Sequence, residues 1–398
     1  MTFSTLLDAS GLTAQGLKFL PVEQAIRWAQ AGYKNGTAYV PPTGGVESPS
    51  TLTDFYNAVL NAPTDRIINA PVGTYALPDV LHPPSNRCVR VLPGTVWKLV
   101  VVPQAILNLG YAKTYAGGFW WPKGVTNTAL IGEPKFVSDD ASYAGHNKEE
   151  GRNAVYVDGG QDHYLEHVVT EGVDNGIMVD STHVTVDGYE ARSGVRKYAV
   201  PAQHYTVHAQ GGQSNLFKRI TQRVFDGHTF SVGNKSADNV WTRCVGWLVK
   251  LDDHEDDTPA RGTLYDGIES QRGGANWWVS GGAAAGFHGG QGNLYWNLTE
   301  RLTVNDPASL VRPLTEPSWL PKIVIVGHQD NVLTPDGPWR ELVPVGVLEP
   351  ESLHEWLVAT YGGSAPPSLK PAVQRATEKL MAMGWLADEA AAVVNPAA

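Results

Sequence analysis

Four short segments in the middle of the chain are versions of one another, and this repeat constrains the fold more than any other feature. Each has a polar residue, an aliphatic, an aromatic, two variable residues and a closing apolar residue. The segments are 215–220, 239–244, 263–268 and 293–298, and their aliphatic residues are spaced 24, 24 and 30 positions apart. A period of roughly 20–50 residues is typical of solenoids and propellers, because one unit cannot bury its apolar face alone.

The run lengths favour a right-handed parallel β-helix over a propeller. From about 125 to 300, short β-rich runs such as 154–157 and 163–169 alternate with turns, and no helical spacers separate them. A propeller blade needs about 40 residues, whereas a β-helix coil needs roughly 20–30. We therefore predict an all-β solenoid over 66–345, an N-terminal helical cap over 1–65 and a C-terminal helical cap or tail over 346–398. Within the caps, helices are expected near 22–31, 52–60, 349–357 and 371–394.

The side-chain register of the repeat contains a conflict. If Leu216 and Ile220 both face the core, alternation along a strand places Lys218 there as well. An unpaired buried Lys is costly. Either a bulge resets the strand, or this sheet lines a polar site.

Composition limits the partners. The net charge of −10 argues against nucleic acid as the main partner, because phosphate binding needs a basic face. No run of 18 or more apolar residues predicts a membrane span. The first residues show no secretory signal. Extracellular action and a place in a phage virion both remain open. Cys88 and Cys244 are the only cysteines and are expected to be buried thiols rather than a pair.

The most unusual stretch is acidic, from Asp252 to Asp257, with Arg261 shortly after it. Crowded carboxylates raise one another's pKa values, and glycosidic cleavage needs one protonated and one ionised carboxyl. Asp253 and Glu255 are therefore catalytic candidates, with His254 and Arg261 as substrate-binding candidates. A solvated acidic turn is the simpler alternative, and a calcium loop is a second one.

A second cluster, Asp226 and His228, lies about one coil earlier in the sequence. Residues one coil apart at the same turn of a β-helix are about 4.8 Å apart, so both clusters could share one groove. Asp266 and Glu269 follow one strand later and are added to the catalytic candidates. Asp-Gly is also a common turn, which is the simpler explanation of 226–227.

Large aromatic residues are numerous, with 13 Trp and 15 Tyr. Core filling explains most of them, and the alternative is stacking against sugar rings. We assign that binding role to Trp241, Tyr265 and Trp277. His288, in a glycine-rich loop, is a further substrate-binding candidate. The loop is not expected to bind a nucleotide, because no P-loop sequence or helix start follows it.

A more basic patch offers a different chemistry. It contains Arg192, Arg196, Lys197, His204 and His208. A lyase abstracts the proton next to a uronate carboxylate and needs a cation and a base, for which Lys197 or His208 could serve. A solvated edge is the simpler explanation. No Cys/His spacing predicts a metal site, and calcium is the only cofactor considered.

The run 226–297 resembles right-handed parallel β-helix proteins of bacterial or phage type, in the broad pectate-lyase-like superfamily. The resemblance rests on short stretches at 239–241, 253–254, 264–266, 288–289 and 295–297, and on 349–354 as a closing helix. It covers roughly 70 central residues. It implies a β-helix that acts on glycans, with no fixed reaction, since the superfamily holds hydrolases, lyases, transferases and non-catalytic tailspikes.

These observations favour a polysaccharide-cleaving enzyme that uses a carboxylate pair, by hydrolysis or intramolecular glycosyl transfer. The alternatives are a polysaccharide lyase and a glycan-binding tailspike or structural β-helix without turnover. The expected partner is an oligo- or polysaccharide. A homotrimer follows by analogy with tailspikes only.

Overall fold

The structure is a computed structural model of the chain. It describes the following residues: 2–3, 22–77, 81–99, 118–139, 141, 152–196, 202–233, 235–247, 249–254, 260–271, 276–278, 293–300, 324–326, 339–341, 348–349 and 351–361.

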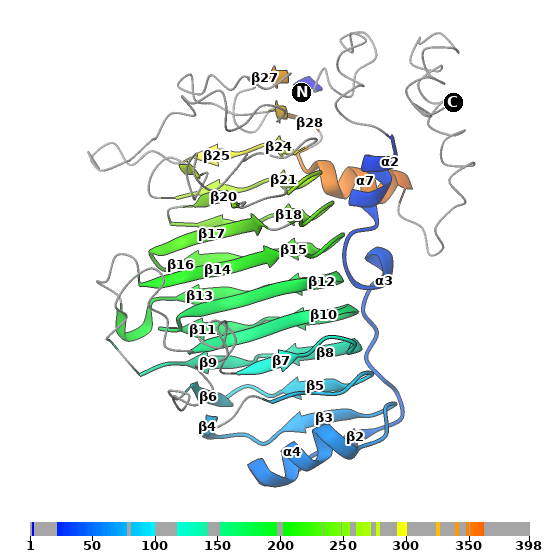
Figure 1. Cartoon of the computed structure of the whole chain (residues 1–398), viewed down its shortest axis with the longest axis vertical. Coiled ribbons are helices and arrows are strands. Elements are labelled where there is room, and N and C mark those ends of the chain that lie inside the picture. Colours follow the sequence, from blue (N-terminus) through cyan, green and yellow to red (C-terminus); the bar gives the residue numbers. More distant parts are fainter. Residues whose placement is uncertain are drawn as a thin grey trace.

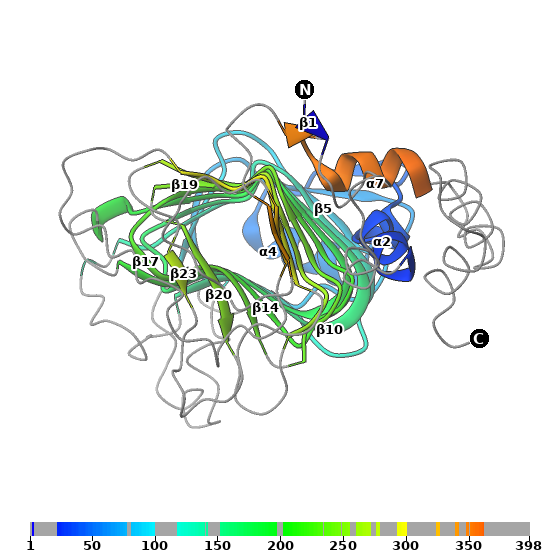
Figure 2. The same cartoon turned by 90° about the horizontal axis from the view of Figure 1, so that it is seen from above.

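The described strands wind into stacked coils in which every pairing between the main strands is parallel (Figure 1). The predicted parallel β-helix is therefore confirmed. Seen from above, each coil has three sides, and each side belongs to one sheet (Figure 2). The long strands β10 (Asn153–Glu166) and β12 (Asn175–Asp187) pass from the first side to the second and join those two sheets.

The three sheets are listed here in coil order. The first contains β7 (Phe119–Trp121), the N-terminal halves of β10 and β12, β14 (Gln203–Gln210), β17 (Asp226–Gly233), β20 (Lys250–His254) and β23 (Asn276–Trp278). The second contains β2 (Val46–Glu47), β3 (Ile67–Ala70), β5 (Cys88–Val91), β8 (Thr126–Gly132), the C-terminal halves of β10 and β12, β15 (Leu216–Lys218), β18 (Val240–Thr242), β21 (Leu264–Asp266), β24 (Leu294–Trp296), β26 (Val324–Val326) and β27 (Trp339–Glu341). The third contains β4 (Thr74–Leu77), β6 (Val96–Leu99), β9 (Lys135–Val137), β11 (Val169–Glu171), β13 (Glu190–Arg192), β16 (Thr221–Arg223), β19 (Val245–Gly246), β22 (Glu269–Ser270) and β25 (Thr299–Glu300). Separately, β1 (Thr2–Phe3) pairs with β28 (Leu348–Glu349).

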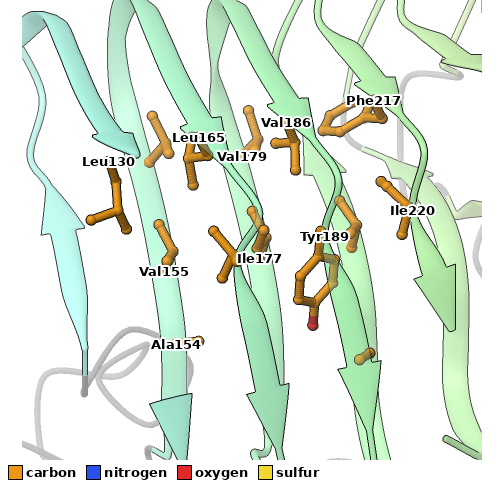
Figure 3. Packing of buried hydrophobic residues seen from close by; sticks show 14 of the residues in the cluster. Leu130, Ala154, Val155, Leu165, Ile177, Val179, Val186, Tyr189, Phe217 and Ile220 are labelled. Carbon is orange, nitrogen blue, oxygen red and sulfur yellow. The ribbon is translucent and has the colours of Figure 1, made fainter. Parts of the chain in front are cut away.

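The core is a column of apolar side chains that point into the coils (Figure 3). Aliphatic residues such as Val155 and Ile177 recur at the same position in neighbouring coils. The aromatic position of the repeat also faces inward, and there the rings of Phe217 and Trp241 stack with centroids 4.1 Å apart. The solenoid is thus held by like side chains stacked between coils, as expected when no coil can bury its own apolar face.

The polar first residue of each repeat has a structural role. Asn215 and Asn239 are completely buried at the corner between the first and second sheets. The side-chain oxygen of Asn239 accepts the backbone N–H of Asn215 at 3.1 Å, and that of Asn215 accepts the N–H of Val184 at 2.8 Å. Asn293 accepts the N–H of Thr263 in the same way at 2.9 Å. These bonds satisfy backbone groups at a corner where the strand ladder is interrupted.

A left-handed residue resolves the register conflict of the repeat. Phe217 faces the core, whereas Leu216 and Lys218 lie on the outer face. The next residue, Arg219, has φ 56°, which turns the chain into the third sheet and restarts the alternation, so Ile220 is again buried. Positive φ recurs at the same corner at 167, 188, 243, 267 and 297. Of the two explanations offered by the sequence, a local reset of the side-chain alternation is therefore the one that the structure shows.

The N-terminal segment is a strap as well as a cap. Helix α4 (Leu52–Asn61) closes the first coil and buries Phe55 against Trp97. Residues 22–47, which we call the strap, instead run along the outer face of the second sheet (Figure 1). They include helix α2 (Val22–Ala29) and the single turn α3 (Tyr33–Gly36).

Hydrogen bonds tie the strap to several coils. The indole N–H of Trp28 donates to the carbonyl of Gly262 at 2.5 Å, and the N–H of Gly32 donates to Ser214 at 2.7 Å. Farther along, the N–H of Tyr33 donates to Thr185 Oγ1 at 2.8 Å. The strap therefore covers the second sheet over a large part of its length.

At the other end of the chain, helix α7 (Leu353–Tyr361) packs beside α2 over the last described coils (Figure 1). The helices predicted near 22–31 and 52–60 are confirmed. The closing helix begins at 353 rather than 349, because Leu348 and Glu349 pair with β1. The predicted helix at 371–394 lies outside the described residues. Cys88 and Cys244 are both free and buried, as expected. Among the described helices, none is long and apolar enough to cross a membrane.

Candidate functional site

The outer faces of the second and third sheets are occupied by structural contacts. The strap and α7 cover the second sheet. On the third, Glu171 binds Lys135 at 2.9 Å and Arg192 at 3.2 Å, and Glu190 binds Arg192 at 2.7 Å and Arg223 at 3.2 Å. Such a ladder of ion pairs across strands stabilises sheet pairing. Within the described part of the chain, the outer face of the first sheet also gathers acidic, aromatic and histidine side chains.

Alternation along the strands fixes which residues of the first sheet face outward. Val155 and Val157 point into the core, so Tyr156 and Asp158 point away from it. Register then aligns the outer positions of neighbouring coils. One such row consists of Trp120, Tyr156, Met178, His208 and Ser231, and its backbone register continues through Asp252 and Trp278.

The adjacent outer row contains a carboxylate pair. Asp158 on β10 and Asp180 on β12 are register partners, and both side chains are half-buried. Adjacent strands lie about 4.8 Å apart, so the two carboxyl groups are neighbours. Burial, and then the charge of Asp158, raise the pKa of Asp180, and the ammonium of Lys123 partly offsets this rise. Asp180 therefore keeps its proton to a higher pH than a free aspartic acid does.

Lys123 reaches this pair from the turn between β7 and β8. A Cβ added to Gly159 would lie 3.1 Å from Cγ of Lys123, so the lysine stem runs over the turn that follows Asp158. Gly159 also has φ +96°, a conformation that glycine adopts without strain. The turn between β7 and β8 therefore places a cation next to the carboxylate pair, over the middle of β10.

Beyond the pair, a tyrosine is surrounded by three histidines. The ring centroid of Tyr205 lies 4.0 Å from that of His204, 4.4 Å from His208 and 4.7 Å from His228. His208 Nδ1 is 2.9 Å from Ser231 Oγ. All four rings are at least nine-tenths buried. The predicted binding residue His228 and the lyase candidate His208 are thus brought together on the first sheet.

Asp226, predicted as catalytic, begins β17 and is buried. Its carboxylate accepts hydrogen bonds from Thr206 Oγ1 at 2.5 Å and Thr229 Oγ1 at 2.8 Å, and from Gln222 Nε2 at 3.4 Å. These contacts join the start of β17 to β14 and to β16 of the third sheet.

Asp253 and His254 lie on β20, next to β17 in the first sheet. The predicted stacking of the two clusters is offset, because Asp253 pairs with Val232 and His254 with Gly233 rather than with Asp226 and His228. Trp277, a predicted sugar-binding residue, lies on β23 and pairs with Leu251. The roles predicted for Asp253, His254 and Trp277 stay predictions.

Asp266, Glu269 and Arg261 lie on other sides of the coil. Asp266 is on the second sheet, fully buried beneath α7. Glu269 is on the third sheet, between Val245 and Thr299. Arg261 lies at the corner before the second sheet, in a bridge with Ala237. The expected common wall of acids therefore does not include Asp266 or Glu269.

Trp241 and Tyr265 are completely buried inside the solenoid. Their rings stack on one another at 6.2 Å, and Tyr265 stacks on Tyr295 at 4.9 Å. The core-filling alternative describes both residues, and neither enters the site proposed below.

The basic patch is divided. Arg192 belongs to the ion pairs of the third sheet, and Arg196 forms a buried pair with Asp174 at 2.9 Å. The predicted candidates Glu255, His288 and Lys197 lie outside the described residues, as do residues 255–257 of the acidic stretch with its calcium-loop alternative, whereas 252–254 of that stretch lie on β20. Within the part of the chain that the structure describes, no group of three or more His, Cys, Asp or Glu side chains could hold a metal ion.

Sequence reasoning missed Asp158 and Asp180, although a signal was present. Residues 155–158 and 177–180 both read apolar, large, Val, Asp, and they are 22 positions apart. The four-fold repeat lies in later coils, and there the outer positions of the first sheet hold other residues than the two aspartates.

Neither the comparison with protein-family models nor the comparison with curated proteins finds a match. Among solved structures, the chain is similar in shape to an alginate lyase from Paenibacillus sp. str. FPU-7, with 15% identity, TM-score 0.43, and 77% of this chain and 98% of that chain covered. It is also similar to a family 28 exopolygalacturonase from Yersinia enterocolitica, with 11% identity, TM-score 0.41 and coverage of 77% and 78%. A third is PfbA, a surface adhesin of Streptococcus pneumoniae, with 7% identity, TM-score 0.39 and coverage of 73% and 71%. At these identities and TM-scores we draw nothing about function from the likeness.

Proposed function

We propose that the chain is a carbohydrate-active enzyme that cleaves glycosidic bonds of an oligo- or polysaccharide with Asp158 and Asp180. The observation that carries this proposal is the carboxylate pair itself. The two side chains are register partners on the outer face of adjacent strands, and the pKa of Asp180 is raised. Glycosidic cleavage needs two such carboxyl groups in different protonation states.

In the proposed reaction, Asp180 donates its proton to the glycosidic oxygen as the bond from that oxygen to the anomeric carbon breaks. The carboxylate of Asp158 bonds to the anomeric carbon in the same step. Water then attacks that carbon, its proton passes to Asp180, and the bond to Asp158 breaks. Both carboxyl groups return to their starting states, and one water has been added across the bond.

The spacing of the strands supports this double displacement. Adjacent strands are about 4.8 Å apart, close to the roughly 5–5.5 Å between carboxyl groups of retaining enzymes and below the 6.5–9.5 Å of inverting ones. A sugar acceptor in place of water would give glycosyl transfer from the same intermediate. We therefore expect retention at the anomeric carbon.

The half-buried ring of Trp120 offers an aromatic surface one coil from Asp158. It lies on β7, where it pairs with Tyr156, and its ring is 5.2 Å from that of His82. We propose that a sugar unit next to the cleaved bond packs on this indole, since aromatic faces bind the C–H faces of sugars.

The test is cleavage of a glycan panel by the full chain, followed by chromatography of the products. Asp180→Asn is expected to lower kcat by at least about 100-fold, the lower bound for loss of general acid–base catalysis, without changing the melting temperature. Asp162→Asn is the matched control, because Asp162 lies on β10, the strand that carries Asp158, and has φ 63°, where Asn is equally tolerated. Full activity in Asp180→Asn would overturn the assignment, and glycan binding without any product would favour a binding protein.

A second candidate is a polysaccharide lyase, favoured by the stacked Tyr205 and His208. Tyrosine and histidine are both suited to removing or donating a proton in β-elimination. Lys123 would then face the substrate carboxylate. The products separate the two reactions, since elimination leaves a double bond that absorbs in the ultraviolet and hydrolysis leaves none.

A further inference from the structure

The two carboxyl groups of the pair differ in what precedes them on their strands. Tyr156 lies two residues before Asp158, on the same outer face, and its hydroxyl is 3.2 Å from Asp158 Oδ1. Met178 lies two residues before Asp180 and is the register partner of Tyr156. A tyrosine hydroxyl can donate a hydrogen bond to a carboxylate, whereas a thioether has no proton to donate.

The ring of Tyr156 is held in place. It is only 4% exposed and packs against the indole of Trp120, with centroids 6.0 Å apart. On its other side, Met178 occupies the paired position of the next coil and is 2% exposed. A ring packed on both sides has little rotamer freedom, so its hydroxyl stays directed at Asp158.

The polar and titratable groups around the pair lie on β10, β12, β14 and the turn between β7 and β8. Asp158 faces Asp180 from β10, and Lys123 acts on Asp180 from the turn before β8. On β14, Gln210 follows the partner of Val179 and contributes a neutral amide, and His208 lies in the neighbouring outer row. Two residues before Asp158 on its strand is a hydroxyl donor, Tyr156, and the paired position before Asp180 is Met178.

We propose that Tyr156 is a positioning residue that decides the roles within the pair: its hydroxyl keeps Asp158 ionised, and Asp180 therefore carries the proton. This inference rests on the proposed function for its catalytic meaning. Asp158 becomes the nucleophile and Asp180 the acid, rather than the reverse. A hydrogen bond to the charged form of a carboxyl favours that form, and a neighbouring ionised carboxyl disfavours a second charge.

The decisive measurement is carboxyl NMR titration of the full chain labelled at aspartate, without substrate. Tyr156→Phe removes only the hydroxyl, so part of the proton held by Asp180 should move to Asp158 and the titration midpoint of Asp180 should fall. Asp158→Asn is the second variant and should lower the midpoint of Asp180.

Tyr75→Phe is the matched control, because the hydroxyl of Tyr75 donates to the carbonyl of Val72, away from the pair. An unchanged Asp180 midpoint in Tyr156→Phe would overturn the inference. That outcome leaves the proposed function standing, which fails instead if Asp180→Asn keeps its turnover. Where turnover is measurable, its pH profile should shift in Tyr156→Phe and stay in place in Tyr75→Phe.

Discussion

Replacing Asp266 by Ala should destabilise the docking of α7, and the cost should grow as the pH falls. The Asp266 carboxylate accepts hydrogen bonds from Thr242 Oγ1 at 2.8 Å, Ser352 Oγ at 2.5 Å and the backbone N–H groups of Leu353 at 2.9 Å and His354 at 3.3 Å. The two N–H groups belong to the first turn of α7, where a helix has no internal acceptors.

Two effects of different sign set the magnitude. Loss of the acceptor leaves two buried N–H groups unsatisfied, at about 1–3 kcal/mol each, while the two hydroxyls can rotate toward other acceptors. Against this, burial raises the pKa of Asp266 from 3.8 to about 6, although the hydrogen bonds oppose the rise. Keeping the group ionised at neutral pH therefore costs the folded state about 3 kcal/mol, and the Ala variant escapes this cost.

The sign of the pH dependence follows from linkage. A carboxyl with a raised folded-state pKa favours the folded form most when it is protonated, and this contribution is lost as pH rises from about 4 to about 6. The free energy of α7 opening in the unchanged protein therefore increases relative to that in Asp266→Ala as the pH falls. We expect the difference in α7 opening free energy to increase by about 2 kcal/mol between pH 7.5 and pH 4.5.

Hydrogen exchange of the α7 amides measures this opening directly, since a solenoid need not unfold in one step. Burial lowers the pKa of His354 to about 4, so docking of α7 weakens below about pH 6.5 in both proteins, and this shared contribution cancels in the difference. Glu351→Gln is the control: Glu351 pairs with Arg243 at the exposed surface, and such pairs contribute less than about 1 kcal/mol. A difference that shrinks on acidification would show that the four donors outweigh burial, and would refute this account of Asp266.

Two further predictions concern the solenoid itself. Trp241→Ala should lower the unfolding free energy by about 3–5 kcal/mol in chemical denaturation, since its fully buried ring stacks on Phe217; a loss below about 1 kcal/mol would contradict the aromatic column. Gly160→Ala should be poorly folded, with reduced yield and melting temperature, because φ is +74° and the new Cβ would lie on the Val125 carbonyl oxygen. Ala at Gly124, which also has positive φ but open space around it, should cost only the backbone strain of about 1 kcal/mol.

The sequence predicted the solenoid well, because stacked coils require similar residue types at equivalent positions. The four aliphatic–aromatic segments mark the second sheet, and their polar first residues mark its corner. What could not be predicted was the direction of each side chain. One residue with positive φ, such as Arg219, changes the alternation, and arginine gives no sign of that conformation.

The candidate site could not be predicted in full for the same reason, since the sequence does not show which side chains point toward the core. Trp241 and Tyr265 face the core, and Asp266 serves the first turn of α7, although composition alone suits all three to a sugar site. Asp226, His228, Asp253 and His254 do share the first sheet, as the coil spacing predicted, but with a shift along the strands. Placing Asp158 beside Asp180 requires the register of two 22-residue coils, which only the pairing of β10 with β12 supplies.

The path of the strap has a consequence for the order of events during synthesis. Trp28 leaves the ribosome early, yet the carbonyl to which it donates belongs to Gly262, 234 residues later. At about 5–20 residues per second, that acceptor emerges some 10–50 seconds after the indole. Helix α2 must therefore stay undocked until the coil that contains Gly262 has been synthesised, and its docking then fastens coils that have already formed.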